Sequence, residues 1–290
     1  MDYLLHVLVL AMIYTVLAVS LDLLAGQTGL LSIAHAAFYG IGAYSSALIT
    51  TSSHLSFGVG VVVGMTAAVL ASAVLSLSSL RLHDDYFVIA TFGCQMILFS
   101  IFNNWMGLTR GPLGIPGIPR PVIFGWHVQS HLEFVVLSAI CAVVSHTAVW
   151  RLASSPFGRV LRAIREDEVL AKSLGKNTLR FKMTAFAASA GLAALAGSLY
   201  AHYITFIEPT SFAVGESILV VSMVVIGGAG SRWGPLIGAL VLVTLPEVLR
   251  FSGVPSNVAA NVRQIFYGAL LVIMMMVRPR GLVGRYGFGR

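Results

Sequence analysis

Long, continuous apolar runs constrain this sequence more than any other feature. Nine of them lie near residues 4–24, 29–50, 57–80, 86–102, 132–150, 183–206, 213–229, 234–251 and 262–279. A helix needs about 20 mostly apolar residues to cross the hydrocarbon core of a bilayer. Because these runs do not alternate with period two, they favour spanning helices over barrel strands. We therefore predict an all-α polytopic membrane protein of about nine transmembrane helices, in one domain over residues 1–290.

The composition supports lipid as the main solvent of this chain. Hydrophobic residues make up 57% of the sequence and charged residues only 10%, whereas soluble domains carry about 25% charged residues. The net charge is +7, but the basic residues gather in particular loops, so no nucleic-acid partner is predicted. Cys94 and Cys141 lack the spacing of metal ligands, and no metal site is predicted.

The distribution of lysine and arginine predicts how the chain is oriented. Eight of these residues lie in segment 151–182, four in the C-terminal tail and two in short turns on the same side, whereas four lie on the other side. Short loops rich in basic residues stay in the cytoplasm. We therefore expect segment 151–182 and the C-terminus to be cytoplasmic and the N-terminus to be outside.

Residues 26–50 are unusual for a plain membrane anchor because they combine four glycines with polar side chains. Irregular backbone at membrane depth is tolerated only where protein or a water-filled cavity surrounds it. This segment is therefore the candidate for a re-entrant or broken helix, and Gln27, Thr28, His35 and Phe38 are candidates for a substrate pathway. The glycines also fit close packing between helices, so both interpretations stay open.

The longest predicted external connection spans residues 103–131. Four prolines and three glycines occur between Arg110 and Pro121, which excludes a regular helix and favours a stiff, folded loop. Such a loop serves either as a rigid cap over the spans or as a surface that receives an external protein.

The only long cytoplasmic stretch, residues 151–182, predicts a short amphipathic helix over 156–175. Ser155-Pro156 has the signature of a helix start and Gly175 that of a helix end. Apolar residues recur between them at three- and four-residue spacing: Phe157, Leu161, Ile164, Ala171 and Leu174. This stripe would be buried either in lipid headgroups or in a groove on a cytoplasmic protein.

No nucleotide-binding motif accompanies these helices. The sequence has no Gly-x-x-x-x-Gly-Lys-Ser/Thr, and the nearest glycine-rich run, Gly227–Pro235, lacks the lysine. We therefore predict a transport subunit rather than an enzyme, with any ATPase on another polypeptide.

Four segments of the sequence resemble the LivH/LivM permeases, and they occur in that family's order. They are Gly26–Ser32 with His35–Tyr44, the loop Gly111–Pro121, Ser155–Arg159 with Ala163–Gly175, and Val224–Ser231 with Gly234–Ala239. The external Gly–Pro loop and the Ser-Pro-Phe-Gly-Arg opening resemble the LivM branch more than the LivH branch. The resemblance covers most of the chain, and the joint match is highly specific.

The resemblance implies the permease fold of an ABC importer in the bacterial inner membrane, taking up branched-chain or related amino acids. Some members of the family handle urea, amides or other small solutes. It implies a second LivH-type permease, two cytoplasmic ATPase subunits that use ATP and Mg, and a periplasmic solute-binding protein as partners. This chain would bind no cofactor. The resemblance also makes residues 156–175 the ATPase-coupling helix, with these candidates: Phe157, Arg159, Leu161, Ile164, Arg165, Glu166, Leu174 and Gly175.

Two other functions have weaker support. A secondary transporter needs an ion-coupling cluster deep in several spans, but the acidic side chains fall mostly near predicted helix ends. An intramembrane enzyme would need more than the acidic pair in His83-Asp84-Asp85, which has no second acidic motif to hold Mg²⁺ with it.

Overall fold

The structure is a computed structural model, and it describes residues 2–53, 55–79, 84–123, 125–251, 268–274, 276–278 and 281–284. Nearly all of the elements are helices. They are α1 (Asp2–Thr28), α2 (His35–Ser52), α3 (Phe57–Ser79), α4 (Asp84–Asn104), α5 (Met106–Thr109), the 3₁₀ turn η1 (Gly111–Leu113), α6 (His131–Ser154), α7 (Pro156–Glu166), α8 (Glu168–Ser173), α9 (Thr178–Ile204), the 3₁₀ turn η2 (Pro209–Phe212), α10 (Val214–Gly227) and α11 (Gly234–Phe251).

The prediction of an all-α polytopic membrane protein is confirmed. Within the described residues, six helical segments are long and apolar enough to cross a membrane: α1, α3, α4, α6, α9 and residues 209–227. The first eight predicted apolar runs each coincide with a helix. The ninth run, 262–279, is described only in part, at 268–274 and 276–278, whereas Arg81, Arg263 and most of the basic tail lie outside the described residues.

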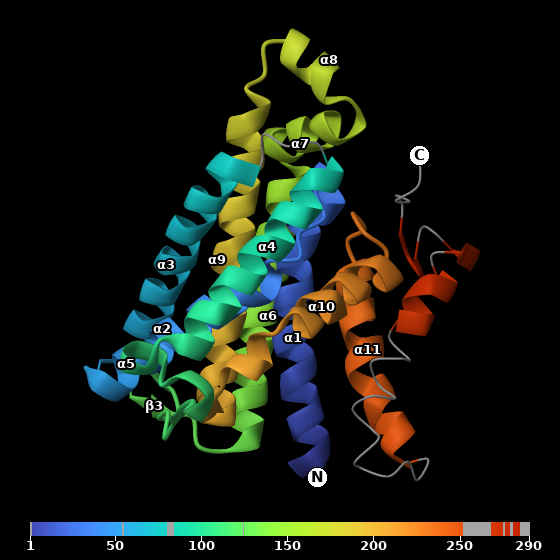
Figure 1. The fold of residues 1–290 in the computed structure, drawn as a ribbon. Helices are drawn as coiled ribbons and strands as arrows, with labels where there is room; N and C mark the ends of the chain where they lie inside the picture. Colours follow the sequence, from blue (N-terminus) through green and yellow to red (C-terminus); the bar gives the residue numbers. More distant parts are fainter. Residues whose placement is uncertain are drawn as a thin grey trace.

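The long helices run between two opposite ends of the molecule (Figure 1). The start of α1 lies at one end together with α5 and β3, whereas α7 and α8 form the other end. Residues 281–284 return to the α7 end, because Leu282 and Val283 donate backbone hydrogen bonds to Ile226 and Gly227 of α10. The N-terminus and segment 151–182 thus lie at opposite ends, and which end faces the cytosol stays a prediction.

Helices α2 and α9 pack unusually closely. A Cβ atom added at Gly197 of α9 would lie 1.9 Å from the carbonyl oxygen of Tyr39, and one at Gly42 of α2 would lie 2.1 Å from that of Ala194. Glycine is required at both positions because any side chain would occupy the space of the opposing backbone. The packing interpretation of the glycines is therefore confirmed for Gly42.

The irregular backbone expected within 26–50 occurs at residues 29–34. Helix α1 continues through Gly26 and ends at Thr28, where Gly29 adopts a φ of 77°. The His35 side chain then bonds Ser20, about two turns before the end of α1, so the non-helical chain turns back toward the middle of α1 before α2 begins. The predicted helix start at residue 29 is therefore six residues too early.

The buried start of α2 depends on side chains from other helices. The N–H groups of Ala36 and Ala37 bond to Ser217 of α10 at 2.9 Å and to Gln95 of α4 at 2.8 Å. The first N–H groups of a helix have no partner within the helix, and lipid offers none. These contacts allow a helix to begin inside the membrane-spanning part of the protein.

The loop at the N-terminal end folds as a cap on α9. Strand β1 (Ile115–Pro116) pairs antiparallel with β4 (Phe206–Ile207), and β2 (Val122–Ile123) pairs with β3 (Trp126–His127). Ile118 also donates a backbone hydrogen bond to Thr205, just after α9. These bonds support the cap interpretation, and reception of an external protein stays a prediction.

Candidate functional site

The predicted amphipathic helix over 156–175 is in fact two helices, α7 and α8. Ser155 caps α7 by accepting a hydrogen bond from the N–H of Gly158, and Pro156 occupies the first helical position. The chain then breaks at Asp167, whose carboxylate accepts a hydrogen bond from Leu170 at 2.9 Å. A side chain of this kind starts a new helix, which explains why one predicted helix becomes two.

The apolar stripe of this segment is mostly covered by the chain itself. Leu161 is 0% exposed and Ile164 is 3% exposed, because α7 packs against α1, α6 and α9. Phe157 stacks on Phe181 of α9, with ring centroids 5.3 Å apart. The expectation that the whole stripe is buried by lipid or another protein is wrong for Leu161 and Ile164. Leu174, assigned to the same stripe, is 71% exposed.

A different apolar surface faces outward from this end. Val169 and Leu170 of α8 are 77% and 57% exposed, and together with Leu174 they form a small patch that we call the α8 tip. Figure 1 shows α8 projecting beyond the spanning helices. Three large apolar side chains in so short a segment are typical of a protein contact or a membrane-surface contact.

Glu168 holds α8 against the start of α9. Its carboxylate accepts hydrogen bonds from Lys182 at 2.6 Å and Thr178 at 2.8 Å, and it pairs with Lys172 at 3.0 Å. Burial alone raises the pKa of Glu168, but the hydrogen bonds from Lys182, Thr178 and Lys172 outweigh burial and lower the pKa to about 2.

Acid should therefore loosen α8 from α9. Because the folded-state pKa of Glu168 is lowered to about 2 from an ordinary 4.5, its stabilising contribution is present above the ordinary pKa and is lost as pH falls toward 2. Glu168→Gln should mimic this loss at neutral pH. Limited proteolysis of the α8–α9 turn measures it: cleavage of the variant should be faster at pH 7, and equal rates for variant and parent would contradict the contact.

Arg165 of α7 reaches the C-terminal end of α1. Its Nη1 donates to the carbonyl oxygen of Gly26 at 2.5 Å, and its Nη2 pairs with Glu166 at 3.0 Å. Its side chain also crosses Gly29, where an added Cβ would lie 2.9 Å from the Cγ of Arg165. A cation is favourable at a helix C-terminus, where free carbonyl groups concentrate negative charge. The guanidinium of Arg165 thus joins α7 to α1 through a charge-assisted hydrogen bond.

A third element joins this contact through the glycine-rich turn after α10. The carboxylate of Asp22 in α1 accepts a hydrogen bond from the backbone N–H of Gly230 at 2.7 Å. An added Cβ at Gly26 would lie 2.4 Å from that same nitrogen. Contacts thus link α7 to α1, and α1 to the turn that connects α10 to α11.

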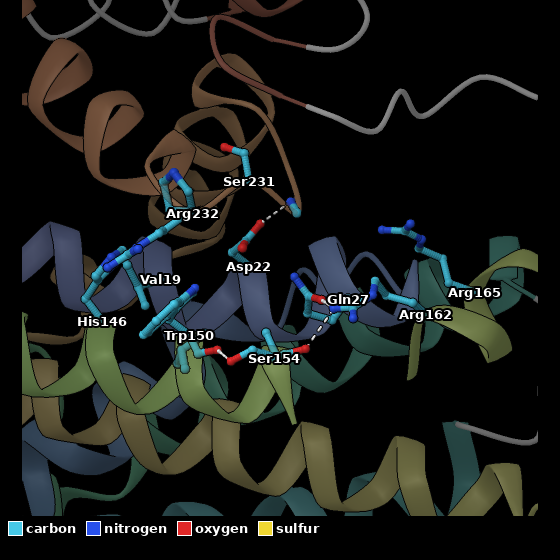
Figure 2. Close-up of a pocket in the computed structure, with 14 residues that line it drawn as sticks. Val19, Asp22, Gln27, His146, Trp150, Ser154, Arg162, Arg165, Ser231 and Arg232 are labelled. Carbon is cyan, nitrogen blue, oxygen red and sulfur yellow. Dashed lines mark hydrogen bonds between the residues drawn. The ribbon is translucent and has the colours of Figure 1, made fainter. Parts of the chain in front are cut away.

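A cavity of about 480 Å³ lies beside this junction (Figure 2). Residues from α1, α6, α7 and the turn at 228–233 line it. Arg162 is one of the lining residues, and its Nη1 donates to Gln27 at 3.1 Å and to the carbonyl oxygen of Ala153 at 2.7 Å. Of the four predicted pathway residues, Gln27 is the one that lines this cavity.

The other three predicted pathway residues are buried and do not line this cavity. Thr28 donates to the carbonyl oxygen of Leu24, His35 bonds Ser20 at 2.7 Å, and Phe38 packs edge-on against Phe186. Contact with substrate stays a prediction for all four. No local sequence pattern indicates Gln95 and Ser217, which accept hydrogen bonds from the start of α2, because they belong to helices far away in the sequence.

Comparison with known proteins identifies the family. A family described as "Branched-chain amino acid transport system / permease component" matches residues 3–275. The chain belongs to this permease family. The predicted resemblance to LivH/LivM permeases is therefore confirmed.

The curated relatives of this permease include both LivM and LivH proteins. It is 35% identical to the high-affinity branched-chain amino acid transport system permease protein LivM of Escherichia coli, over 94% of this chain and 68% of that protein. It is 28% identical to the corresponding LivH of Salmonella typhimurium, over 94% of this chain and 91% of that protein. No solved structure matches the chain.

Membership of the permease family gives the α7–α8 end a context. A multi-pass permease of a transport system works with other components of that system, so its large exposed surfaces are candidates for contacts with them. The α8 tip, its Glu168 anchor and the Arg165 junction together form one connected path from an exposed surface to α1 and α10.

Proposed function

We propose that this chain is the LivM-type permease subunit of an ATP-driven importer for branched-chain or related amino acids. The observation that carries the proposal is the α8 tip, an exposed apolar surface joined through Arg165 to the spanning helices. The printed names of the LivM and LivH relatives supply the solute class. The permease itself performs no chemistry on the solute.

In this proposal two cytoplasmic ATPase subunits use ATP and Mg, and one of them receives the α8 tip in a groove. Closure of the ATPases displaces α7, α8 and the start of α9 together, because Glu168 holds α8 to α9 and Phe157 of α7 stacks on Phe181 of α9. Arg165 passes the displacement to Gly26, and Asp22 passes it to Gly230. The solute path then opens and closes by movement of α1, α2 and α10, as expected of alternating access.

The remaining partners occupy other parts of the surface. A second permease of the LivH type completes the solute path, to which Gln27, Thr28, His35 and Phe38 contribute. A periplasmic solute-binding protein delivers the solute to the end that carries β1–β4. This arrangement requires the α7–α8 end to be cytoplasmic, in agreement with the excess of basic residues there.

Leu170→Asp should weaken ATPase binding by about 30-fold, because a charge at the centre of an apolar contact removes a hot spot worth about 2 kcal/mol. Leu113→Asp is a matched control, since Leu113 is 72% exposed at the opposite end of the molecule. Co-purification of tagged permease with the partner ATPase subunits measures the effect. Leu113→Asp should retain the ATPase, and retention of the ATPase by Leu170→Asp as well would exclude the proposed contact.

A further inference from the structure

The rim of the 480 Å³ cavity carries an arginine held between two exposed tryptophans. The guanidinium carbon of Arg232 lies 4.0 Å from the ring centroid of Trp150 in α6 and 5.1 Å from that of Trp233. Trp150 is 41% exposed and Trp233 is 49% exposed. Within the described part of the chain, Arg232 forms no ion pair with a carboxylate. Its position is set by aromatic rings, and its N–H groups are available to a ligand.

The cavity behind this rim has an excess of positive charge. Arg162 and Arg165 line it together with Arg232, as Figure 2 shows, and the one acidic side chain among the lining residues is Asp22. The Asp22 carboxylate already accepts a hydrogen bond from Gly230. An anion entering the cavity would therefore meet Arg232, Arg162, whose Nη1 already donates to Gln27 and Ala153, and Arg165, which already pairs with Glu166.

An exposed apolar stripe leads away from the rim along α6. Trp150, Thr147, Val143, Ile140 and Val136 follow one another at alternating three- and four-residue spacing, so they lie on one helix face. Val143 is 62% exposed, Ile140 is 51% exposed and Val136 is 42% exposed. Thr147 keeps the stripe apolar because its hydroxyl bonds back to the carbonyl oxygen of Val143.

Depth in the membrane connects these two features. The cavity is lined by the last turns of the spanning helix α6 and by the C-terminal part of α1, and the end of a spanning helix is expected at the level of the lipid headgroups. Tryptophan and arginine are typical of that level, with the hydrocarbon beginning below them. An anion that carries its own aliphatic chains fits both the arginines above and the stripe below.

We propose that this cavity binds the phosphate headgroup of an anionic phospholipid, with an acyl chain lying along Val143, Ile140 and Val136. Arg232 and Arg162 bind the phosphate oxygens, since a guanidinium matches phosphate geometry. A soluble phosphate ion shares this headgroup chemistry, but it would make no use of the apolar stripe. Basic pockets between spanning helices are established binding sites for lipid headgroups in general.

The test uses the full-length chain, delipidated in detergent and then given phosphatidylglycerol, phosphatidylcholine or inorganic phosphate. Native mass spectrometry counts retained lipid, and thermal unfolding reports protection. Phosphatidylglycerol should bind about tenfold more tightly than phosphatidylcholine, because phosphatidylcholine carries the same phosphate together with a quaternary ammonium cation, which the arginines of the cavity repel. Arg232→Gln should remove the preference, whereas Lys176→Gln, an exposed position outside the cavity, should keep it.

Two results would overturn the proposal. One is an unchanged preference for phosphatidylglycerol in Arg232→Gln, which would place the lipid elsewhere. The other is protection by inorganic phosphate equal to that by phosphatidylglycerol, which would assign the cavity to a soluble anion. Arg232 is exposed, so the variant should fold, and lipid counting is independent of its thermal stability.

Discussion

Gly197→Ala should remove most of the folded protein, although it adds only a single methyl group. The added Cβ would lie 1.9 Å from the carbonyl oxygen of Tyr39 and 2.9 Å from the nitrogen of Ala43. Both are backbone atoms of α2, so no side-chain rotation relieves the clash and the two helices must separate. Overpacking of this kind costs about 3 kcal/mol or more, which is a large part of the stability of an ordinary domain.

Gly191→Ala is the matched control for this substitution. Gly191 lies in the same helix, where an added Cβ would meet only the side chains of Val69 at 3.4 Å and Met65 at 3.9 Å. Because alanine is favoured over glycine inside a helix by about 1 kcal/mol, this variant should be neutral or stabilised. Thermal unfolding of purified protein compares the two, and equal melting temperatures would show that α2 and α9 do not approach so closely.

Arg165→Ala should abolish most transport while leaving the ATPase bound. The substitution removes the charged donor that joins α7 to the Gly26 carbonyl, and loss of a hydrogen bond from a charged group costs about 1.5–3 kcal/mol. If that contact transmits the displacement of α7, uptake should fall by about 10- to 100-fold. The α8 tip is untouched, so ATP hydrolysis should continue without productive uptake.

Arg151→Ala serves as the control at the same end of the molecule. Arg151 is exposed in the last turn of α6, and no contact of its side chain with α1 is seen in the described structure. Its variant should retain most of the uptake measured in proteoliposomes. Equal uptake by Arg165→Ala and the parent protein would exclude Arg165 as the connecting residue, whereas loss of ATPase binding would indicate damage to the docking surface instead.

The sequence predicts the spanning helices well because length and continuous hydrophobicity are local properties. It also predicts the start of α7, since Ser155-Pro156 carries the capping signal within two residues. The break at Asp167 has a local signal too, an aspartate followed three residues later by the N–H it caps. The apolar spacing of Ala171 and Leu174 continues past this break and predicts one stripe through both. Leu174 is exposed instead.

The candidate site could be predicted only in part because its contacts join distant segments. Arg165 meets Gly26 and Asp22 meets Gly230 across more than a hundred residues, and Arg232 meets Trp150 across the whole of α9 and α10. No spacing rule connects such positions. The start of α2 at residue 35 likewise depends on Gln95 and Ser217, which the local sequence does not reveal.

The side of the membrane that α8 occupies decides whether an ATPase can act through it. A Leu174→Cys variant, with Cys94 and Cys141 replaced by alanine, should react with a membrane-impermeant maleimide in inverted vesicles but not in intact spheroplasts. Leu113→Cys should show the reverse pattern. Labelling of Leu174→Cys in intact spheroplasts would place α7 and α8 outside the cell and contradict the mechanism.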